Sequence, residues 1–271
     1  MTDAYETITL GRADGVAWLT LNRPEKRNAL SMPMQKEMRA ALADIAADRQ
    51  VRCLVLTGSG QGFCAGAELD KLWGGNGGDR SFGQEVAEVM DQLSHPLIKE
   101  IQALPVPVVA AVNGAAAGAG ASLALAADVV LARRSAYFLL PFVPNLGILP
   151  DLGGTWHLPR LVGRGRAMGL ALLGDRLPAE QAAEWGLIWA CTEDDALGDE
   201  ANAVATHLAA GPPDVVRHLR EAFDAAEQNT LAAQLDHEGW KQAALLDRPA
   251  FREGVAAFLE KRAPEFGDRE T

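Results

Sequence analysis

The sequence predicts an α/β protein with a helical C-terminal region. Short apolar strands alternate with helical segments as far as residue 192, whereas from residue 199 onward the chain is almost wholly helical, with breaks at residues 211–213 and near Pro249. Strands that alternate with helices are typical of an α/β core. We therefore divide the chain into a core, residues 1–198, and a helical region, residues 199–271.

Local patterns predict the elements of the core. Residues 6–21 alternate between apolar and polar side chains around Asp14-Gly15, which is a strong signal for a β-hairpin. Apolar positions at helical spacing predict a helix over residues 31–46. The remaining expectations are strands at 51–56, 108–112, 128–131 and 187–192, and helices at 82–104, 122–127, 156–173 and 177–186.

The composition excludes several classes of partner. The 271 residues are 48% hydrophobic and carry a formal charge of −11, which predicts a large core and argues against nucleic acid or an anionic membrane surface. The longest apolar stretch, residues 115–132, is dominated by Ala and Gly and contains Asp128, so we expect a buried helix rather than a membrane span.

The cysteines and the N-terminal residues indicate the cellular compartment in which the protein is expected. Cys53, Cys64 and Cys191 lack metal-ligand spacing and leave an odd thiol, so we expect a reducing, cytoplasmic environment and no bound metal. The polar start, residues 1–6, has no apolar segment of the kind that a signal peptide carries.

Two strand-to-helix corners expose the backbone. At residues 108–132, a β-branched strand leads through the small residues 115–120 into a helix. Small residues let a ligand approach the main chain closely, and the first amides of a helix have no intrahelical partner. Residues 51–69 run in the same way from a strand through a Gly-rich turn to residues 64–67. Two such corners would supply two N–H groups to one oxyanion; close helix packing is the alternative explanation.

Other motifs are uninformative or fail. The glycine-rich residues 73–79 predict a mobile lid over a pocket or an ordinary surface loop. Residues 60–65 match the spacing of a dinucleotide fingerprint, but the second strand with its acidic end is missing. Ser122 lacks the second glycine of a nucleophile elbow, and the five histidines are scattered without metal spacing, as expected for surface or capping positions.

Four motifs in order resemble the crotonase superfamily, the enoyl-CoA hydratase/isomerase family. They occupy residues 21–30, 62–69, 111–120 and 149–155, and the ending at residues 253–262 is similar as well. The resemblance implies a spiral of ββα repeats with a helical C-terminal trimerisation region, assembled as a homotrimer or a dimer of trimers. It implies an acyl-CoA thioester substrate, of which CoA is a part, and no further cofactor. By position, the enolate would be held by the backbone amides of Ala67 and Ala119.

The resemblance also implies where CoA binds. The CoA moiety would lie along the loop that contains Lys26 and Ala29, with the adenine near Ala65. Phe258 and Lys261 would approach from the C-terminal region, in many members from a neighbouring subunit. Without the resemblance, both lysines would be read as solvated surface charges.

The acidic residues select the reaction. Hydratases of this family resemble one another in having two glutamates, and the corresponding positions here are Ser122 and Val143. Asp151 remains, at the position where isomerase-type members carry a proton-transferring aspartate. The apolar residues of the segment 142–149 are expected to desolvate it and to raise its basicity. The motif at 149–161 looks closest to members that rearrange ring-epoxidised phenylacetyl-CoA or shift enoyl double bonds.

Alternatives remain at this stage. Asp151 would serve as a nucleophile in dehalogenase-type members, but those carry a tryptophan where this chain has Val143, and Asp151 is also placed to cap a helix that starts near residues 153–155. A hydratase with atypical acids, Asp151 or Glu68, is a second enzyme hypothesis. A non-catalytic acyl-CoA-binding member is a third reading.

Overall fold

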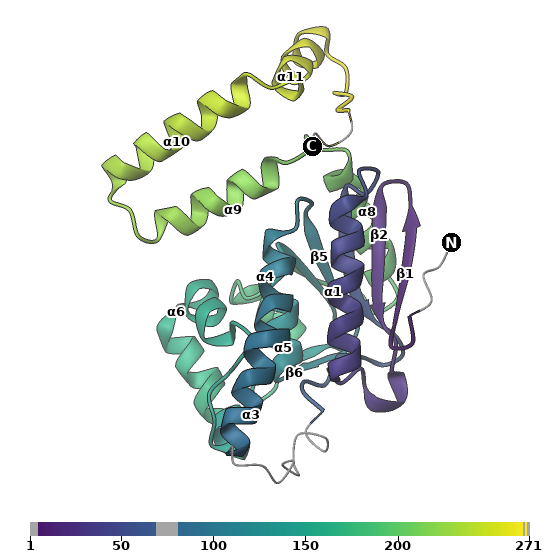
Figure 1. Ribbon diagram of the computed structural model, residues 1–271, viewed down its shortest axis with the longest axis vertical. Coiled ribbons are helices and arrows are strands. Elements are labelled where there is room, and N and C mark those ends of the chain that lie inside the picture. The colour runs from purple at the N-terminus through teal and green to yellow at the C-terminus, as the bar shows by residue number, and fades with distance from the viewer. Residues whose placement is uncertain (1–4, 69–80, 268, 270–271) are drawn as a thin grey trace.

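The computed structural model describes residues 5–68, 81–267 and 269, and Figure 1 shows how the elements are arranged. The predicted glycine-rich lid, residues 73–79, lies outside the described residues. The described strands form two sheets. The larger has the order β1 (Ile8–Ala13), β2 (Val16–Leu21), β3 (Cys53–Gly58), β5 (Val108–Val112), β7 (Val129–Arg133) and β10 (Ala190–Thr192), and the smaller has the order β4 (Gly62–Cys64), β6 (Ala115–Ala117), β8 (Tyr137–Leu139) and β9 (Leu177–Pro178).

Successive strands divide between the two sheets and are then followed by a helix. In each of the pairs β3–β4, β5–β6 and β7–β8, the first strand joins the large sheet in parallel and the second joins the small one. The helices that follow are α3 (Phe82–Val89), the π-helical turn η2 (Met90–Ser94) and α4 (His95–Ala103), then α5 (Ala119–Leu125), then the π-helical turn η3 (Phe142–Leu146) and α6 (Gly154–Leu173). The repeats therefore wind a ββα spiral, as predicted.

The N-terminal hairpin and the helix that follows it confirm the elements predicted from the sequence. β1 and β2 form an antiparallel hairpin whose turn residues, Asp14 and Gly15, have φ of 50° and 78°, the left-handed values that a two-residue hairpin turn requires. The helix that follows, α1 (Met32–Ala47), begins where expected, because the Ser31 hydroxyl accepts a hydrogen bond from the Met34 amide at 3.2 Å.

Both faces of the large sheet are covered. Along β3, Leu54 and Leu56 belong to the core on the side of α1, whereas Cys53 and Val55 pack with α8 (Leu197–Ala209) on the other side. A strand buried on both faces reads as a continuous apolar run, which is what the sequence shows here. The division of the chain at residue 198 stays a prediction, and α8 itself packs on the sheet.

The last helices extend away from the sheets. α9 (Val215–Ala226), α10 (Leu231–Leu246) and α11 (Pro249–Glu260) lie together at the top of Figure 1. Arg220 ties α9 to the spiral, because its guanidinium donates to both carboxylate oxygens of Asp128 and to the carbonyl of Leu104 at 2.6 Å. No helix among the described residues is both long and apolar enough to cross a membrane.

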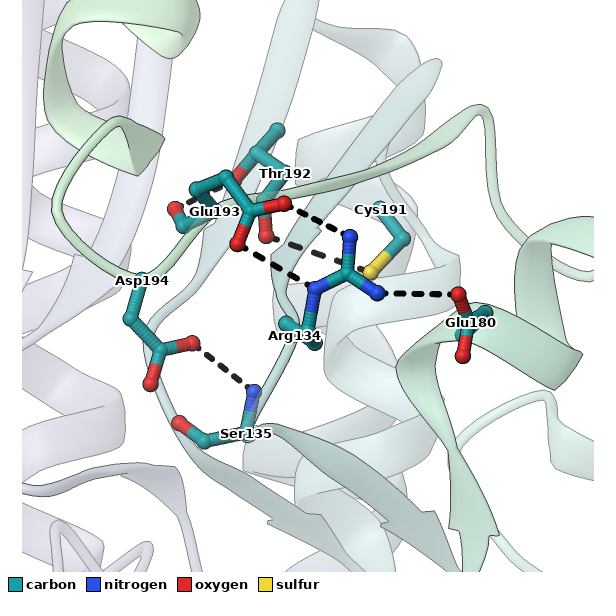
Figure 2. Close-up of polar contacts among 7 residues, drawn as sticks. All are labelled: Arg134, Ser135, Glu180, Cys191, Thr192, Glu193 and Asp194. Atoms are coloured by element: carbon teal, nitrogen blue, oxygen red, sulfur yellow. Dashed lines mark hydrogen bonds and ion pairs between the residues drawn. The ribbon is translucent and has the colours of Figure 1, made fainter.

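An exposed ion-pair network holds the edge strand β10. Figure 2 shows Arg134, directly after β7, between Glu193 after β10 and Glu180 of α7 (Ala179–Glu184). Its guanidinium donates to Glu193 at 2.6 Å and 3.2 Å and to Glu180 at 2.9 Å, while Asp194 accepts from the Ser135 amide at 2.8 Å. The side chains are more than half exposed, so the network locates this corner but stabilises the fold only modestly.

Candidate active site

The backbone corners and the acidic loop meet at one cavity. It has a volume of about 280 Å³ and is bounded by α1, α3, η2 and the loops that follow β4 and η3. Most of its wall is apolar, from Leu30 and Met32 on one side to Val86, Val89 and Met90 on the other. Ala67, Ala119 and Asp151, which lie far apart in the sequence, all line this cavity.

The first corner, after β4, is fixed by backbone hydrogen bonds between residues 66–68 and Leu30. The Leu30 amide donates to the Gly66 carbonyl at 2.8 Å, and the Glu68 amide donates to the Leu30 carbonyl at 3.3 Å. The intervening amide, that of Ala67, points away from this ladder, and no described residue accepts a hydrogen bond from it. The Ala67 N–H is therefore available to a ligand.

The second corner is the beginning of α5. Ala119 is the first residue of the helix, so its amide has no intrahelical acceptor, and none is found elsewhere among the described residues. The two corners pack directly on one another: a methyl group on Gly66, whose φ is 96°, would lie 2.9 Å from the Ala117 oxygen and 3.4 Å from the Ala119 nitrogen. Only glycine permits this approach, and both Ala67 and Ala119 line the cavity.

Asp151 lines this cavity and has one carboxylate oxygen without a partner among the described residues. Its Oδ1 is enclosed by protein and has no hydrogen-bond partner among the described residues. Burial raises the pKa of Asp151 to about 6, although its own backbone amide and the charge of His95 act in the opposite direction. The carboxylate does not cap a helix, because the N-cap of α6 is Gly153, with no side-chain cap. The N-cap alternative is therefore wrong.

The source of this desolvation differs from the prediction. Leu146, Ile148 and Leu149, which were expected to surround Asp151, are 46%, 50% and 74% exposed. The cavity wall beside Asp151 includes the buried Leu152 and Leu30 instead. Within the segment 142–149, Phe142 is buried, but residues 144–149 are exposed, which sequence proximity alone did not reveal.

Glu68 also lines the cavity but is fully engaged. Its two carboxylate oxygens accept from the Arg23 guanidinium at 3.0 Å and 3.1 Å, and only 6% of its side chain is exposed. Arg23 further donates to the Ala29 carbonyl at 3.2 Å. The bidentate pair thus ties the loop after β2 to the corner that carries Ala67.

The two positions that correspond to hydratase acids do not reach the cavity wall. Ser122 is completely buried, and its hydroxyl oxygen would lie 2.8 Å from a methyl group on Gly154, so it packs between α5 and α6. Val143 belongs to η3 and also lies outside the wall. His157 is buried as well, contrary to the expected surface position, and burial lowers its pKa to about 4.

The predicted CoA-binding residues fall into two groups. Lys26 and Ala29 lie on one loop, and the Ala65 amide donates to the Arg27 carbonyl of that loop at 3.0 Å. Asn28 holds the loop in place, since its buried side chain donates to the Ser59 and Gly62 carbonyls.

The second group lies on the last helix. Phe258 is 82% exposed on α11, and Lys261 follows as the C-cap of that helix. In Figure 1, α11 lies at the opposite end of the molecule from α3, which lines the cavity. A single chain therefore does not bring Phe258 and Lys261 to the cavity.

The sequence reading missed three polar residues near the carboxylate: Gln35, Ser94 and His95. Gln35 and Ser94 line the cavity, and His95 acts on the pKa of Asp151. A signal for Gln35 existed, because it continues the apolar stripe of α1 through Met38, Leu42 and Ile45 at helical spacing and is the polar member of that stripe. Within the described residues, no group of three His, Cys, Asp or Glu side chains is arranged to hold a metal.

Comparison with known proteins agrees with this arrangement. The sequence model of the family described as enoyl-CoA hydratase/isomerase matches residues 11–269. A 1,2-epoxyphenylacetyl-CoA isomerase from Escherichia coli is 47% identical over 253 residues, which cover 93% of this chain and 95% of the relative. A probable enoyl-CoA hydratase from Rhodobacter capsulatus is 46% identical over 266 residues, which cover 98% of this chain and all of the relative.

Solved structures show the same fold. An enoyl-CoA hydratase from Bacillus anthracis superposes with a TM-score of 0.88 at 33% identity and covers 96% of this chain and 99% of its own. The chain belongs to the enoyl-CoA hydratase/isomerase family of the crotonase superfamily. It has the crotonase fold and is an acyl-CoA enzyme of that family.

Proposed function

We propose that this enzyme shifts a carbon–carbon double bond in an enoyl-CoA thioester. The thioester oxygen is held by the amides of Ala67 and Ala119, and Asp151 is the acid/base. The Asp151 carboxylate removes a proton from the α carbon of a β,γ-enoyl-CoA, which forms a dienolate, and the same carboxyl group then delivers a proton to the γ carbon. Each amide that stabilises the developing oxyanion contributes about 3 kcal/mol to lowering the barrier.

One observation carries this proposal: a half-buried carboxylate, with one enclosed oxygen, shares a cavity with two backbone amides, and neither this oxygen nor either amide has a hydrogen-bond partner among the described residues. A pKa of about 6 leaves Asp151 mostly ionised at neutral pH yet basic enough to accept a proton. A single carboxyl group suffices for a 1,3-proton shift, because it is protonated when it removes the α proton and can then act as the acid at the γ carbon. Exchange of the carboxyl proton with solvent before this second transfer introduces deuterium in deuterated water.

Hydration is the alternative, supported by the Rhodobacter capsulatus relative, which is described as a probable enoyl-CoA hydratase. Addition of water uses one group to activate the water and another to protonate the α carbon. Among the described residues, the second carboxylate on the cavity wall is that of Glu68, and both of its oxygens are engaged by Arg23. The contacts of Glu68 therefore favour isomerisation over hydration.

We further propose that CoA lies along the loop with Lys26 and Ala29, near Ala65, and that a homotrimer or a dimer of trimers completes the site in the cytoplasm. Large apolar side chains on the last helices support association, since Trp240 is 79% and Phe258 is 82% exposed. In such an assembly Phe258 and Lys261 would reach the CoA of a neighbouring copy. A monomeric mass in analytical ultracentrifugation would contradict it.

The test is solvent-deuterium exchange with a panel of straight-chain and aromatic enoyl-CoAs. The wild type is expected to incorporate deuterium at the α and γ carbons and to interconvert the isomers. Asp151→Asn is expected to lower both rates about 1,000-fold, because the proton acceptor is lost. Asp224→Asn, the same change on the exposed side of α9, serves as the matched control and is expected to keep full activity.

Each other outcome rejects the proposal. Full isomerase activity in Asp151→Asn removes Asp151 as the acid/base. Hydration of crotonyl-CoA that depends on Asp151 or Glu68 favours the hydratase. Tight binding of the thioesters without exchange at either carbon indicates a non-catalytic acyl-CoA-binding protein.

A further inference from the structure

The polar side chains on the cavity wall differ in whether their hydrogen-bonding capacity is used. They are Ser31, Gln35, Glu68, Ser94 and Asp151. The Ser31 hydroxyl accepts from a backbone amide at the start of α1, and Glu68 is bound by Arg23. Asp151 keeps an unpartnered oxygen, which the proposed reaction uses. Gln35 and Ser94 are not needed for that reaction, although both face the same cavity.

Gln35 and Ser94 form a buried pair. Gln35 is 6% and Ser94 is 7% exposed, and the Ser94 hydroxyl donates to the Gln35 Oε1 at 2.7 Å. Ser94 immediately precedes α4 but does not cap it with its side chain. Its hydroxyl instead fixes the Gln35 amide group in one orientation, with the carbonyl end directed to Ser94.

The other end of this amide is a donor without an acceptor. No described residue accepts a hydrogen bond from the Gln35 Nε2, and this nitrogen is not among the fully enclosed unpartnered atoms, so it borders the cavity space. A buried amide without a partner costs free energy that an apolar residue of the same shape would avoid. The pair also joins α1 to η2, a π-helical turn of the kind often found at functional sites.

We infer that Gln35, oriented by Ser94, determines acyl specificity by donating a hydrogen bond to an oxygen carried on the acyl group. The preferred substrates are thioesters whose acyl portion bears an acceptor oxygen, as an ether, epoxide, ketone or hydroxyl, where a plain hydrocarbon chain has a methylene group. This inference rests on the proposed function in one respect, namely that the acyl group of an acyl-CoA occupies the cavity.

The binding of unreactive thioesters tests the inference independently of the chemistry. Heptanoyl-CoA is compared with its 4-oxa, 5-oxa and 6-oxa analogues by titration calorimetry on the full-length protein. These saturated compounds have no double bond to shift, and the three analogues sample the position of the oxygen. At least one of them is expected to bind about tenfold more tightly than heptanoyl-CoA, which is the effect of one additional hydrogen bond.

The matched variant is Gln35→Met, an unbranched apolar side chain of similar length. It is expected to remove the preference, measured as the ratio of the Kd values of the oxa analogue and heptanoyl-CoA in the same variant. Ser94→Ala, which frees the amide to rotate, is expected to weaken the preference without abolishing it. Thermal unfolding of each variant checks that the fold is intact.

Two results overturn the inference. One is a wild type that binds every oxa analogue no better than heptanoyl-CoA, a measurement that needs no variant. The other is a preference that survives in folded Gln35→Met. Failure of the proposed function is distinguishable, because full isomerase activity in Asp151→Asn would remove the reaction mechanism while the oxygen preference in binding remained.

Discussion

Two loops place a carboxylate on the wall of the same cavity, and the two carboxylates are in opposite situations. The loop after β4 carries Glu68, whose two oxygens are held by Arg23. The loop after η3 carries Asp151, whose Oδ1 has no hydrogen-bond partner in the described part of the chain and whose pKa is raised to about 6. Glu68 is buried and the Asp151 Oδ1 is enclosed by protein, but Glu68 is ion-paired with Arg23, whereas no described residue forms an ion pair with Asp151. An acidic residue in a cavity is therefore structural or reactive according to its neighbours.

The backbone of each loop fits its role. Glu68 follows Ala67 directly, and its ion pair with Arg23 holds the corner at which Ala67 lines the cavity. Next to Asp151, Leu152 has a φ of 48° and Gly153 has a φ of 86°, a turn that leads into α6. In the loop after β4, the charge of Glu68 fixes the main chain. In the loop after η3, a left-handed main chain beside Asp151 sets the position of its carboxylate.

The largest expected effect comes from unpairing Glu68. Arg23→Met removes the cation from a pair whose side chains are only 14% and 6% exposed. An uncompensated buried carboxylate is expected to lower the free energy of unfolding by about 3 kcal/mol, measured by urea denaturation at pH 7.5. The double variant Arg23→Met/Glu68→Leu is expected to recover part of this loss, because no charge is then left unpaired. Equal stability of Arg23→Met and wild type would show that Glu68 does not depend on Arg23.

Removing the charge of Asp151 is expected to raise the free energy of unfolding rather than lower it. Its pKa of about 6 in the folded protein exceeds the value of about 3.9 in an unfolded chain, so ionised Asp151 destabilises the fold. The cost is absent below pH 4, where both states are protonated; it grows between pH 4 and 6 and is complete above pH 6. Asp151→Asn is therefore expected to be more stable than wild type by about 2 kcal/mol at pH 7.5 and equally stable at pH 3.5. A variant that is less stable at pH 7.5 would contradict this.

The smallest expected effect is on the pH dependence of kcat/KM. If ionised Asp151 is the base, kcat/KM is expected to fall about tenfold per pH unit below an apparent pKa near 6. His95 lowers the pKa of Asp151 through its charge, so His95→Gln is expected to move this midpoint upward by less than about one unit. A downward shift, or a profile that is flat from pH 5 to 7, would mean that another group controls the rate.

The secondary structure was predictable where elements are long or strongly patterned. The hairpin β1–β2, the helix α1 and the buried strand β5 follow from alternation, capping and β-branched residues. The small sheet was not predicted, because its strands β4 and β6 are three residues long and β6 consists of three alanines. Alanine has little preference for strands, so pairing with neighbours from other repeats creates this sheet.

The amino-acid sequence by itself determined the strand-then-helix rhythm of the core, the glycines that the two corners require, and an aspartate at position 151 with no acid at positions 122 and 143. These are local properties of the chain, which turn chemistry and residue type encode directly. Only the tertiary structure decided which groups meet at the cavity: Arg23 beside Glu68, Ser94 beside Gln35, and the segment 146–149 turned outward rather than around Asp151. Desolvation and ion pairing depend on residues that are distant in the chain, so these contacts arise when the repeats pack together.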